Sequence, residues 1–178
     1  HILLDSRKLL FPDETLFFAL NGERRNGAMY IRELYDKGVM NFIVDENFSE
    51  NAIVNYSDAN FLQVKNVLHS LHALTAFHRK EFNIPVIGIT GSNGKTIVKE
   101  WLYQLLHESY NIVRNPKSYN SQIGVPLSVW QINNQHTLGI FEAGISQPDE
   151  MQRLEKIIEP TIGIFTNIGE AHSEGFLK

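Results

Sequence analysis

The sequence predicts an α/β protein made of a small mixed α/β domain followed by a parallel-sheet domain. Short apolar runs alternate with amphipathic helical patterns along the chain, which is typical of α/β folds. The segment Asn83-Ile84-Pro85 interrupts this alternation and marks a domain boundary. A glycine-rich loop at 88–96 joins a predicted strand to a predicted helix. We therefore expect a first domain at 1–82 and a second, truncated domain at 83–178.

The first 82 residues contain short strands and two helices in this prediction. The predicted strands are 15–20, 41–44 and 61–64, and the predicted helices are 28–37 and 66–82. The first helix should end at Gly38, because glycine accepts the left-handed backbone that commonly follows a helix.

From residue 83 onward, strands and helices alternate as in a parallel sheet. The predicted strands are 86–89, 111–114, 138–141 and 162–165, and the predicted helices are 95–107 and 147–158. The buried face predicted for the first of these helices carries Val98, Trp101, Leu102, Leu105 and Leu106. For the second helix, Ser146 is the expected N-cap, with Pro148 and Asp149 in the first turn.

The composition excludes several classes of protein. Hydrophobic residues make up 43% of the chain, which is enough for a folded core. The net charge of −4 argues against a protein dedicated to nucleic-acid binding. The absence of cysteine excludes disulfides, cysteine-ligated metals and a thiol nucleophile. No apolar run approaches the ~20 residues of a membrane span, and no signal peptide is visible, so we expect a cytoplasmic protein.

The sharpest motif is the glycine-rich stretch 88–96. Its glycines would let the backbone wrap around a phosphate, and the start of the following helix would supply positive potential. Lys95 would then neutralise phosphate charge, and the hydroxyl of Thr96 would ligate Mg²⁺. A strict P-loop needs glycine at position 89, where this chain has isoleucine. The stretch is therefore either a variant phosphate loop or an ordinary strand-to-helix turn.

Polar residues follow three other predicted strands, at the positions where open parallel sheets bind ligands. Glu142 ends an apolar strand and could hold Mg²⁺ beside Thr96, or be a capping or loop acid. His172 could ligate a second metal, touch substrate, or be an ordinary histidine of the surface or core. The polar loop 115–124 could contact a substrate or simply be solvated.

With these motifs in place, the chain resembles the Mur ligase family. The stretch 90–96 is similar to the family's nucleotide loop, 142–144 to its metal-binding acid, 120–126 to its asparagine loop, 166–172 to the form found in the MurF type, and 5–7 with 16–24 to the UDP-binding N-terminal domain. The resemblance covers essentially the whole chain, and its central motifs are specific jointly more than singly.

The resemblance implies roles for individual residues. ATP would be bound by Thr90, Gly91, Ser92, Asn93, Gly94, Lys95 and Thr96. The implied catalytic residues are Lys95, Glu142 and His172, and the implied metal ligands are Thr96, Glu142 and His172. Substrate contacts would come from Asp5, Ser6, Arg7 and Asn120. The chain departs from the family at 26–28, where Asn-Gly-Ala stands in place of the usual Asp-Gly-His.

The resemblance also implies an activity. Members of the MurF type are ATP-dependent amide ligases that join D-alanyl-D-alanine to UDP-MurNAc-tripeptide through an acyl phosphate in the synthesis of peptidoglycan. ATP and Mg²⁺ would be required. The chain begins with His1 and ends soon after a motif. We therefore expect a fragment that lacks the C-terminal ligase domain and the lysine that helps hold the second metal, and that is inactive alone. Some relatives carry an alanine racemase after the ligase, and such a fusion stays open here.

Other functions remain open alongside this one. A MurE-type ligase would add the third amino acid of the peptide instead. Folylpolyglutamate synthase fits less well, because its nucleotide loop lies near the N-terminus, whereas about eighty residues precede the loop here. A P-loop kinase would bind ATP without a UDP-sugar site, and a nucleotide-binding regulatory module would show no turnover. Binding of UDP by residues 1–82 would separate the ligases from the kinase.

Overall fold

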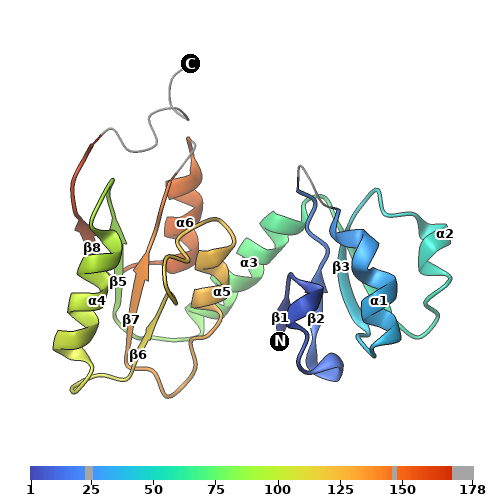
Figure 1. Ribbon diagram of the computed structural model, residues 1–178, viewed down its shortest axis with the longest axis horizontal. Helices are drawn as coiled ribbons and strands as arrows, with labels where there is room; N and C mark the ends of the chain where they lie inside the picture. Colours follow the sequence, from blue (N-terminus) through green and yellow to red (C-terminus); the bar gives the residue numbers. More distant parts are fainter. Residues whose placement is uncertain (23–25, 146–147, 170–178) are drawn as a thin grey trace. The chain divides into compact units, whose positions relative to one another are not determined.

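The computed structural model describes residues 1–22, 26–145 and 148–169 (Figure 1). The chain divides into two compact units, His1–Leu71 and His72–Lys178. The division lies within α3 (Val67–Lys80), because Arg79 near the end of that helix donates hydrogen bonds to carbonyls of the second unit. The domain boundary at residues 82–83 stays a prediction. No helix among the described residues is both long enough and apolar enough to cross a bilayer.

The first unit is built on a four-stranded parallel sheet in the order β1-β2-β3-β4. Its strands are β1 (Ile2–Leu3), β2 (Leu16–Phe18), β3 (Asn41–Asp45) and β4 (Asn60–Val64). Its helices are α1 (Ile31–Asp36) and α2 (Glu50–Ile53), with 3₁₀ turns η1 (Ser6–Lys8), η2 (Pro12–Glu14) and η3 (Gly27–Tyr30). Phe17 and Phe42 of the sheet pack with Ile31 and Leu34 of α1 in its core.

The predicted end of the first helix is confirmed. Gly38 has φ +95°, and its N–H donates to the carbonyl of Tyr35, while Val39 N–H donates to Leu34 O at 3.0 Å. A glycine takes this left-handed conformation without the steric cost of a Cβ, so the chain can turn from α1 into β3 here. The predicted start at residue 28 falls instead in the 3₁₀ turn η3, which leads directly into α1.

The second unit contains a four-stranded parallel sheet in the order β6-β7-β5-β8. Its strands are β5 (Val86–Thr90), β6 (Ile112–Arg114), β7 (Leu138–Glu142) and β8 (Ile162–Phe165). The helices that follow these strands are α4 (Lys95–Leu106), α5 (Gly124–Val129) and α6 (Glu150–Ile158). The expected α/β architecture with a parallel sheet is therefore confirmed.

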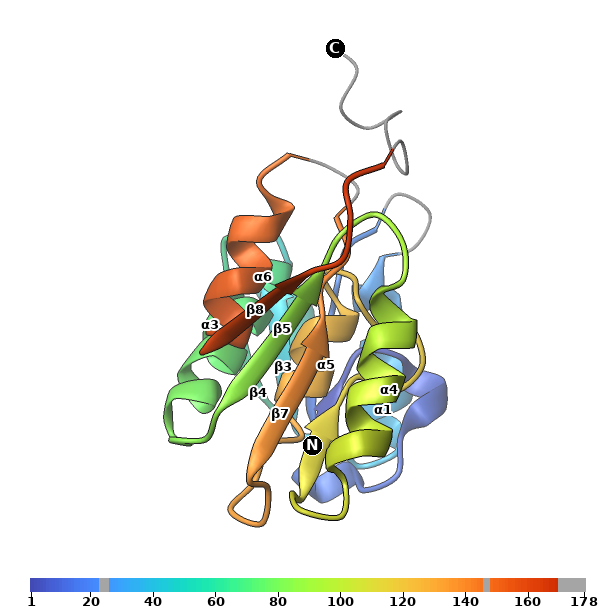
Figure 2. The ribbon, with the colours of Figure 1, turned by 90° about the vertical axis from the view of Figure 1, so that its left-hand side faces the viewer.

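Helices cover both faces of this sheet, as Figure 2 shows. On one face, Val98, Leu102 and Leu106 of α4 pack against apolar residues of β5 and β7. On the other face, α5 and α6 pack against the opposite side chains of the same strands. The helices after the neighbouring strands β5 and β7 thus leave to opposite faces. The carboxyl ends of these two strands form a switch point, which is where open α/β sheets bind ligands.

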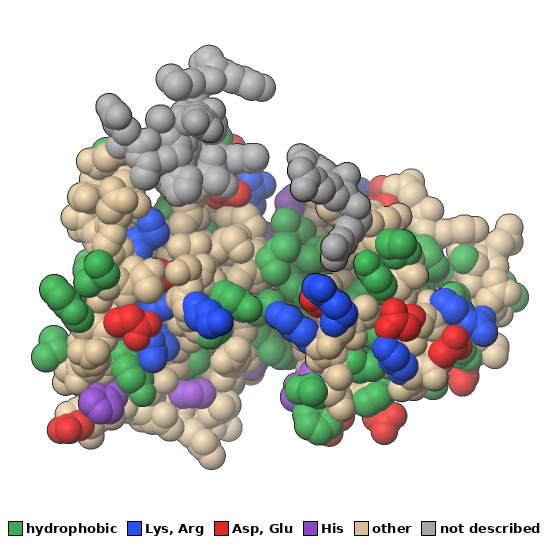
Figure 3. Space-filling model, in the orientation of Figure 1, with side chains coloured by type: hydrophobic (Ala, Val, Ile, Leu, Met, Phe, Trp, Pro, Cys, Tyr) green, Lys and Arg blue, Asp and Glu red, His purple; other side chains and the backbone are tan. Residues whose placement is uncertain are grey.

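The predicted buried face of α4 was too wide. Trp101 and Leu105 are 63% and 77% exposed, and with Ile97 they form part of the hydrophobic surface over α4 in Figure 3. The buried face of α4 turns the other way around the helix and includes Lys99, whose side chain is fully buried. The apolar character of Trp101 had suggested a core position, but the sheet contacts decide which face is covered.

Two further details of the second unit differ from expectation. The predicted helix 147–158 begins later, at Glu150, after Asp149 with φ +65° as its N-cap; Ser146 lies outside the described residues. The helix α5 was not predicted, because it is short and contains Pro126. Proline is tolerated there because it occupies the first turn of the helix, where the backbone N–H has no intrahelical partner.

Candidate functional site

The glycine-rich loop connects the end of β5 to the start of α4. Gly91 has φ +130° and Gly94, the N-cap of α4, has φ +81°. A Cβ on Gly91 would lie 2.1 Å from the hydroxyl oxygen of Thr166, so this position requires glycine both for its backbone angles and for space. The loop therefore turns tightly and delivers the chain to the N-terminus of a twelve-residue helix.

The segment after β8 is bonded to this loop. The backbone N–H of Ser92 donates to Asn167 O, and that of Asn93 donates to Asn167 Oδ1, each at 2.9 Å. The hydroxyl of Thr166 donates to the carbonyl of Asn93 at 2.6 Å. Two predicted motifs, 90–96 and the beginning of 166–172, are thus brought together, because β8 is the immediate neighbour of β5 in the sheet.

Lys95 lies at the opening of the loop. Its ammonium group donates to Gly91 O at 2.5 Å and to Ser92 O at 3.2 Å, and its side chain is part-buried. The first N–H groups of α4 and this ammonium group supply positive charge at the same place, which is the arrangement that binds phosphate groups at helix N-termini. The sequence prediction of a phosphate-binding loop is consistent with this geometry.

Glu142 reaches the loop from the neighbouring strand. It pairs with Ile89 in the β5–β7 register and is fully buried. Its Oε2 accepts a hydrogen bond from the hydroxyl of Thr96 at 2.8 Å, as the predicted pairing of these two residues requires. Its Oε1 is buried and accepts no hydrogen bond from the described residues.

This orphaned oxygen fits a divalent cation. Burying a carboxylate oxygen without a partner is costly, and a cation bound between Glu142 and Thr96 would remove that cost. Mg²⁺ prefers such hard oxygen ligands and usually completes its coordination with phosphate oxygens and water. Among residues 1–22, 26–145 and 148–169, no group of three or more His, Cys, Asp or Glu side chains could enclose a metal alone. His172, the other predicted ligand, lies outside the described residues.

The loop that contains Asn120 also approaches this site. The backbone N–H of Gly144 donates to Asn120 O at 2.8 Å. A Cβ on Gly144 would lie 3.0 Å from Cγ of Asn120, so the glycine allows the two loops to approach closely. Asn120 is therefore placed two residues away along the chain from Glu142's loop partner, although its predicted contact with substrate stays a prediction.

Asp5, Ser6 and Arg7 lie in the first unit and form a local structure of their own. Asp5 accepts hydrogen bonds from Arg7 Nε at 2.8 Å and Arg7 Nη2 at 2.7 Å, and caps the turn η1. The side-chain hydrogen bond from Arg7 lowers the pKa of Asp5 from 3.8 to about 2. Ser6 is buried. The predicted substrate role of these three residues remains a prediction.

The first unit has a cavity of about 310 Å³, and those three residues do not line it. Its lining comes from Ala19, Asn21, Asn26, Ala28, Asp45, Asn47, Phe48, Ser49 and Ala52. It lies beyond the carboxyl ends of β2 and β3, the position of ligand sites in parallel sheets. The sequence analysis noted the stretches 16–24 and 26–28 but not the wall from Asp45 to Ala52, which only the pairing of β2 with β3 brings into place.

Two residues beside Glu142 were not predicted from the sequence. Lys99 is a fully buried lysine of α4, and Asn115 is a fully buried asparagine after β6. The signal for Lys99 was its phase: it lies on the helix face that also carries Lys95, Val98 and Leu102, and lysine is rarely found on a buried face. No such periodic signal exists for Asn115, because it lies in a loop.

Comparison with known proteins gives a consistent result. A family model described as the Mur ligase middle domain matches residues 89–178. The UDP-N-acetylmuramoyl-tripeptide--D-alanyl-D-alanine ligase of Borreliella burgdorferi is 35% identical over 178 residues, which is 97% of this chain and 38% of that protein. This chain thus spans about 38% of the length of that relative.

Two solved structures are similar throughout. A crystal structure of MurF from Acinetobacter baumannii aligns with a TM-score of 0.88 and 28% identity, covering 98% of this chain and 37% of the other. The MurF ligase of Thermotoga maritima, solved in complex with ADP, aligns with a TM-score of 0.84 and 28% identity, covering 96% of this chain and 38% of the other.

Proposed function

This chain belongs to the Mur ligase family, and on that premise we propose that it is the N-terminal and central part of a MurF-type ligase. The longer protein would join D-alanyl-D-alanine to UDP-MurNAc-tripeptide in the synthesis of peptidoglycan. The observation that carries this proposal is the buried pair of Thr96 and Glu142 beside the glycine-rich loop. The names of the relatives from Borreliella burgdorferi and Acinetobacter baumannii support the choice of the MurF type over the MurE type.

ATP would be bound by the loop 90–96. The ADP complex of the Thermotoga maritima relative supports a nucleotide there. Lys95 would contact the phosphates directly, and Thr96 with Glu142 would hold Mg²⁺. The ion supplies neutralisation of negative charge on the phosphate oxygens, which phosphoryl transfer needs more than covalent chemistry. His172 would assist at a second metal, and Asn120, Asp5, Ser6 and Arg7 are proposed substrate contacts.

The proposed reaction has two steps. An oxygen of the terminal carboxylate of UDP-MurNAc-tripeptide attacks the γ-phosphorus of ATP, and ADP leaves. The amine nitrogen of D-alanyl-D-alanine then attacks the acyl carbon of the acyl phosphate, phosphate leaves, and the amine loses a proton as the amide forms. Within this chain, the positive charge of Lys95 would orient the transferred phosphoryl group and stabilise the charge that develops on it.

Other parts of the proposal concern the whole protein. The residues 1–82 would bind the UDP-sugar, with the cavity beyond β2 and β3 as the candidate site. A C-terminal ligase domain would complete the active site in cis, and an alanine racemase domain may follow it only in the parent sequence of a fused relative. Both substrates are precursors made inside the cell, so the protein would work in the cytoplasm.

Calorimetric titration with UDP-MurNAc-tripeptide tests the proposal. We expect the chain to bind it, and to bind UDP-MurNAc-dipeptide, the MurE substrate, more weakly. Ser49→Trp would fill the cavity and should abolish binding; Ser49 makes no side-chain capping bond that the change would remove. Ser57→Trp, at an exposed position outside the cavity, is the matched control. Binding of Mg-ATP without any UDP-sugar binding would contradict the proposal and favour a kinase.

A further inference from the structure

Lys99 is a buried cation that the proposed reaction does not yet use. Its side chain is 0% exposed. Its ammonium group donates to the carbonyl of Asn115 at 3.0 Å and to the carbonyl of Lys117. Burying an ammonium group is costly unless its donors are satisfied, so these contacts are needed to keep Lys99 in place. They also tie α4 to the loop that follows β6.

The same ammonium group lies beside the proposed metal ligand. Nζ of Lys99 is 3.8 Å from Oε2 of Glu142, and both side chains are fully buried. Oε2 also accepts the hydrogen bond from Thr96. Two groups of α4 thus hold one oxygen of the carboxylate, while Oε1 is left without a hydrogen bond from the described residues. The carboxylate has a fixed orientation with one oxygen free.

A second route joins Lys99 to Glu142 through the backbone. Asn115, whose carbonyl accepts from Lys99, also accepts at Oδ1 from the backbone N–H of Glu142 at 2.6 Å. Its Nδ2 donates to Tyr119 O at 2.6 Å. Lys117, the other acceptor's residue, has φ +52°, an unusual angle for a residue with a side chain. Lys99 therefore holds both the side chain of Glu142 and the loop that holds its backbone.

We propose that Lys99 is a positioning residue for the divalent cation bound with the nucleotide. It keeps Oε2 of Glu142 turned toward α4, so that Oε1 is available to the cation beside Thr96, and it fixes the loop 115–117 against the end of β7. The inference rests on the proposed function, because it needs a Mg-nucleotide at the loop. Groups that orient metal ligands without touching the metal commonly alter its affinity by 10–100-fold.

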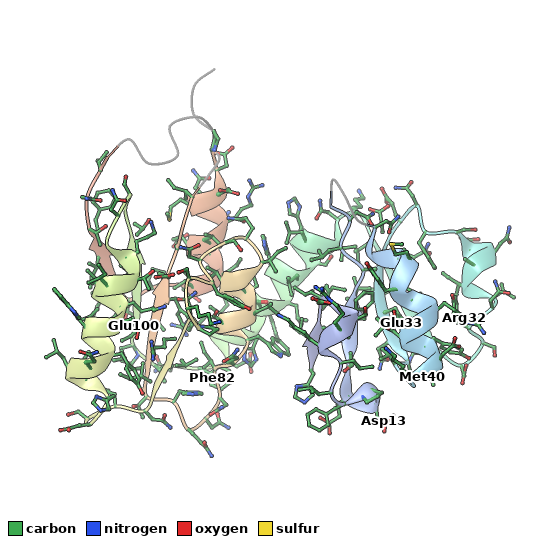
Figure 4. All side chains as sticks on the ribbon, in the orientation of Figure 1. Asp13, Arg32, Glu33, Met40, Phe82 and Glu100 are labelled. Atoms are coloured by element: carbon green, nitrogen blue, oxygen red, sulfur yellow. The ribbon has the colours of Figure 1, made fainter. Side chains whose placement is uncertain are left out.

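The test is the Mg²⁺ dependence of ADP binding, followed with a fluorescent ADP analogue on the 178-residue chain. Lys99→Met removes the charge and the donors at similar volume, and Lys99→Gln is a second variant should the methionine variant not fold. Glu100→Gln is the matched control: Glu100, labelled on α4 in Figure 4, is 3.6 Å from Nζ of Lys99 and bonds Arg114, but does not contact Glu142. Thermal unfolding of every variant is recorded in parallel.

We expect Lys99→Met to raise the Mg²⁺ concentration at half-saturation by about tenfold or more, and Glu100→Gln to leave it unchanged. In a Glu142→Gln background, Lys99→Met should have no further effect on Mg²⁺ dependence, because Lys99 acts through Glu142. A lysine that only stabilises the fold would lower the unfolding temperature without moving the Mg²⁺ midpoint, and that result would overturn the inference. Additive effects of the two substitutions would overturn it too. A wild-type chain that binds no ADP at any Mg²⁺ concentration would instead contradict the proposed function.

Discussion

Among single residues, Glu142 carries the most chemical information in this chain. Its burial is complete, one carboxylate oxygen is bonded to Thr96, and the other accepts nothing from the described residues. A protein retains such a costly arrangement where something binds it. The partner that the surroundings favour is a cation, because Thr96, the glycine-rich loop and Lys95 all lie at the same end of the sheet.

Lys95→Ala should weaken binding of Mg-ATP by about 1.5–3 kcal/mol, because a charged group that donates to phosphate is lost. Isothermal titration calorimetry on the variant and the wild-type chain measures the difference. Lys156→Ala, on α6, is a control of the same charge change away from the loop. Equal affinity of the Lys95 variant and the wild type would remove Lys95 from the site.

Asp5 offers a prediction about stability and pH in the first unit. Its pKa in the folded chain is lowered to about 2 from 3.8 by the hydrogen bond from Arg7. The pair therefore stabilises the fold above pH 4, and this contribution is lost as the pH falls through 2. Because Arg7 is largely exposed, we expect less than about 1 kcal/mol.

Urea unfolding of Asp5→Asn between pH 6 and pH 2 tests this. Asparagine can still cap η1, so the substitution isolates the charge. The difference in free energy of unfolding from wild type should be largest above pH 4 and shrink toward pH 2, and Arg7→Gln should give the same trend. A difference that stays constant over this range would rule out the ion pair as its cause.

The sequence predicts single residues of the site unevenly. Glu142 and Thr96 were expected to meet, because each stands at the carboxyl end of a predicted strand or at the start of the helix after one, and parallel strands present these ends at one edge. Lys99 and Asn115 were not expected. Their importance comes from the contact of a loop with a helix far away in sequence, which local patterns do not encode.

At the scale of elements, three loops converge because of the strand order. β7 and β8 lie on either side of β5, so the segments after all three strands meet at the glycine-rich loop. The sequence predicted these strands closely, since each is a continuous apolar run. It did not predict α5, which is short and contains Pro126, or the late start of α6 after Asp149, because both depend on turn geometry that the hydrophobic pattern does not record.

The glycine-rich loop permits a matched pair of substitutions. Both Gly91 and Gly94 have positive φ, but a Cβ on Gly91 would collide with Thr166 and meet Asn167, whereas a Cβ on Gly94 meets nothing within 4 Å. Gly94→Ala should lower the free energy of unfolding by about 1–2 kcal/mol through its backbone alone. Gly91→Ala should cost about 1–3 kcal/mol more through crowding. Urea denaturation measures both, and equal losses would show that the contact with the β8 loop is not tight.

At the scale of the whole molecule, each unit offers one site at the carboxyl end of its parallel sheet. The first unit has the cavity beyond β2 and β3, and the second has the loop with Lys95, Thr96 and Glu142. A ligase that joins a UDP-sugar peptide to an amine through ATP needs a site for each of its substrates. The chain spans about 38% of its Borreliella burgdorferi relative, and we propose that the remaining length supplies the site for D-alanyl-D-alanine.

Phosphate release tests the central claim most directly. The full-length protein that contains this chain should release phosphate from Mg-ATP only when UDP-MurNAc-tripeptide and D-alanyl-D-alanine are both present. The 178-residue chain, mixed with the same substrates, should stay at background, because closure of a third domain completes the catalytic site in such enzymes. Substantial release by the chain alone, or release by the full-length protein that does not depend on the UDP-sugar peptide, would contradict the account.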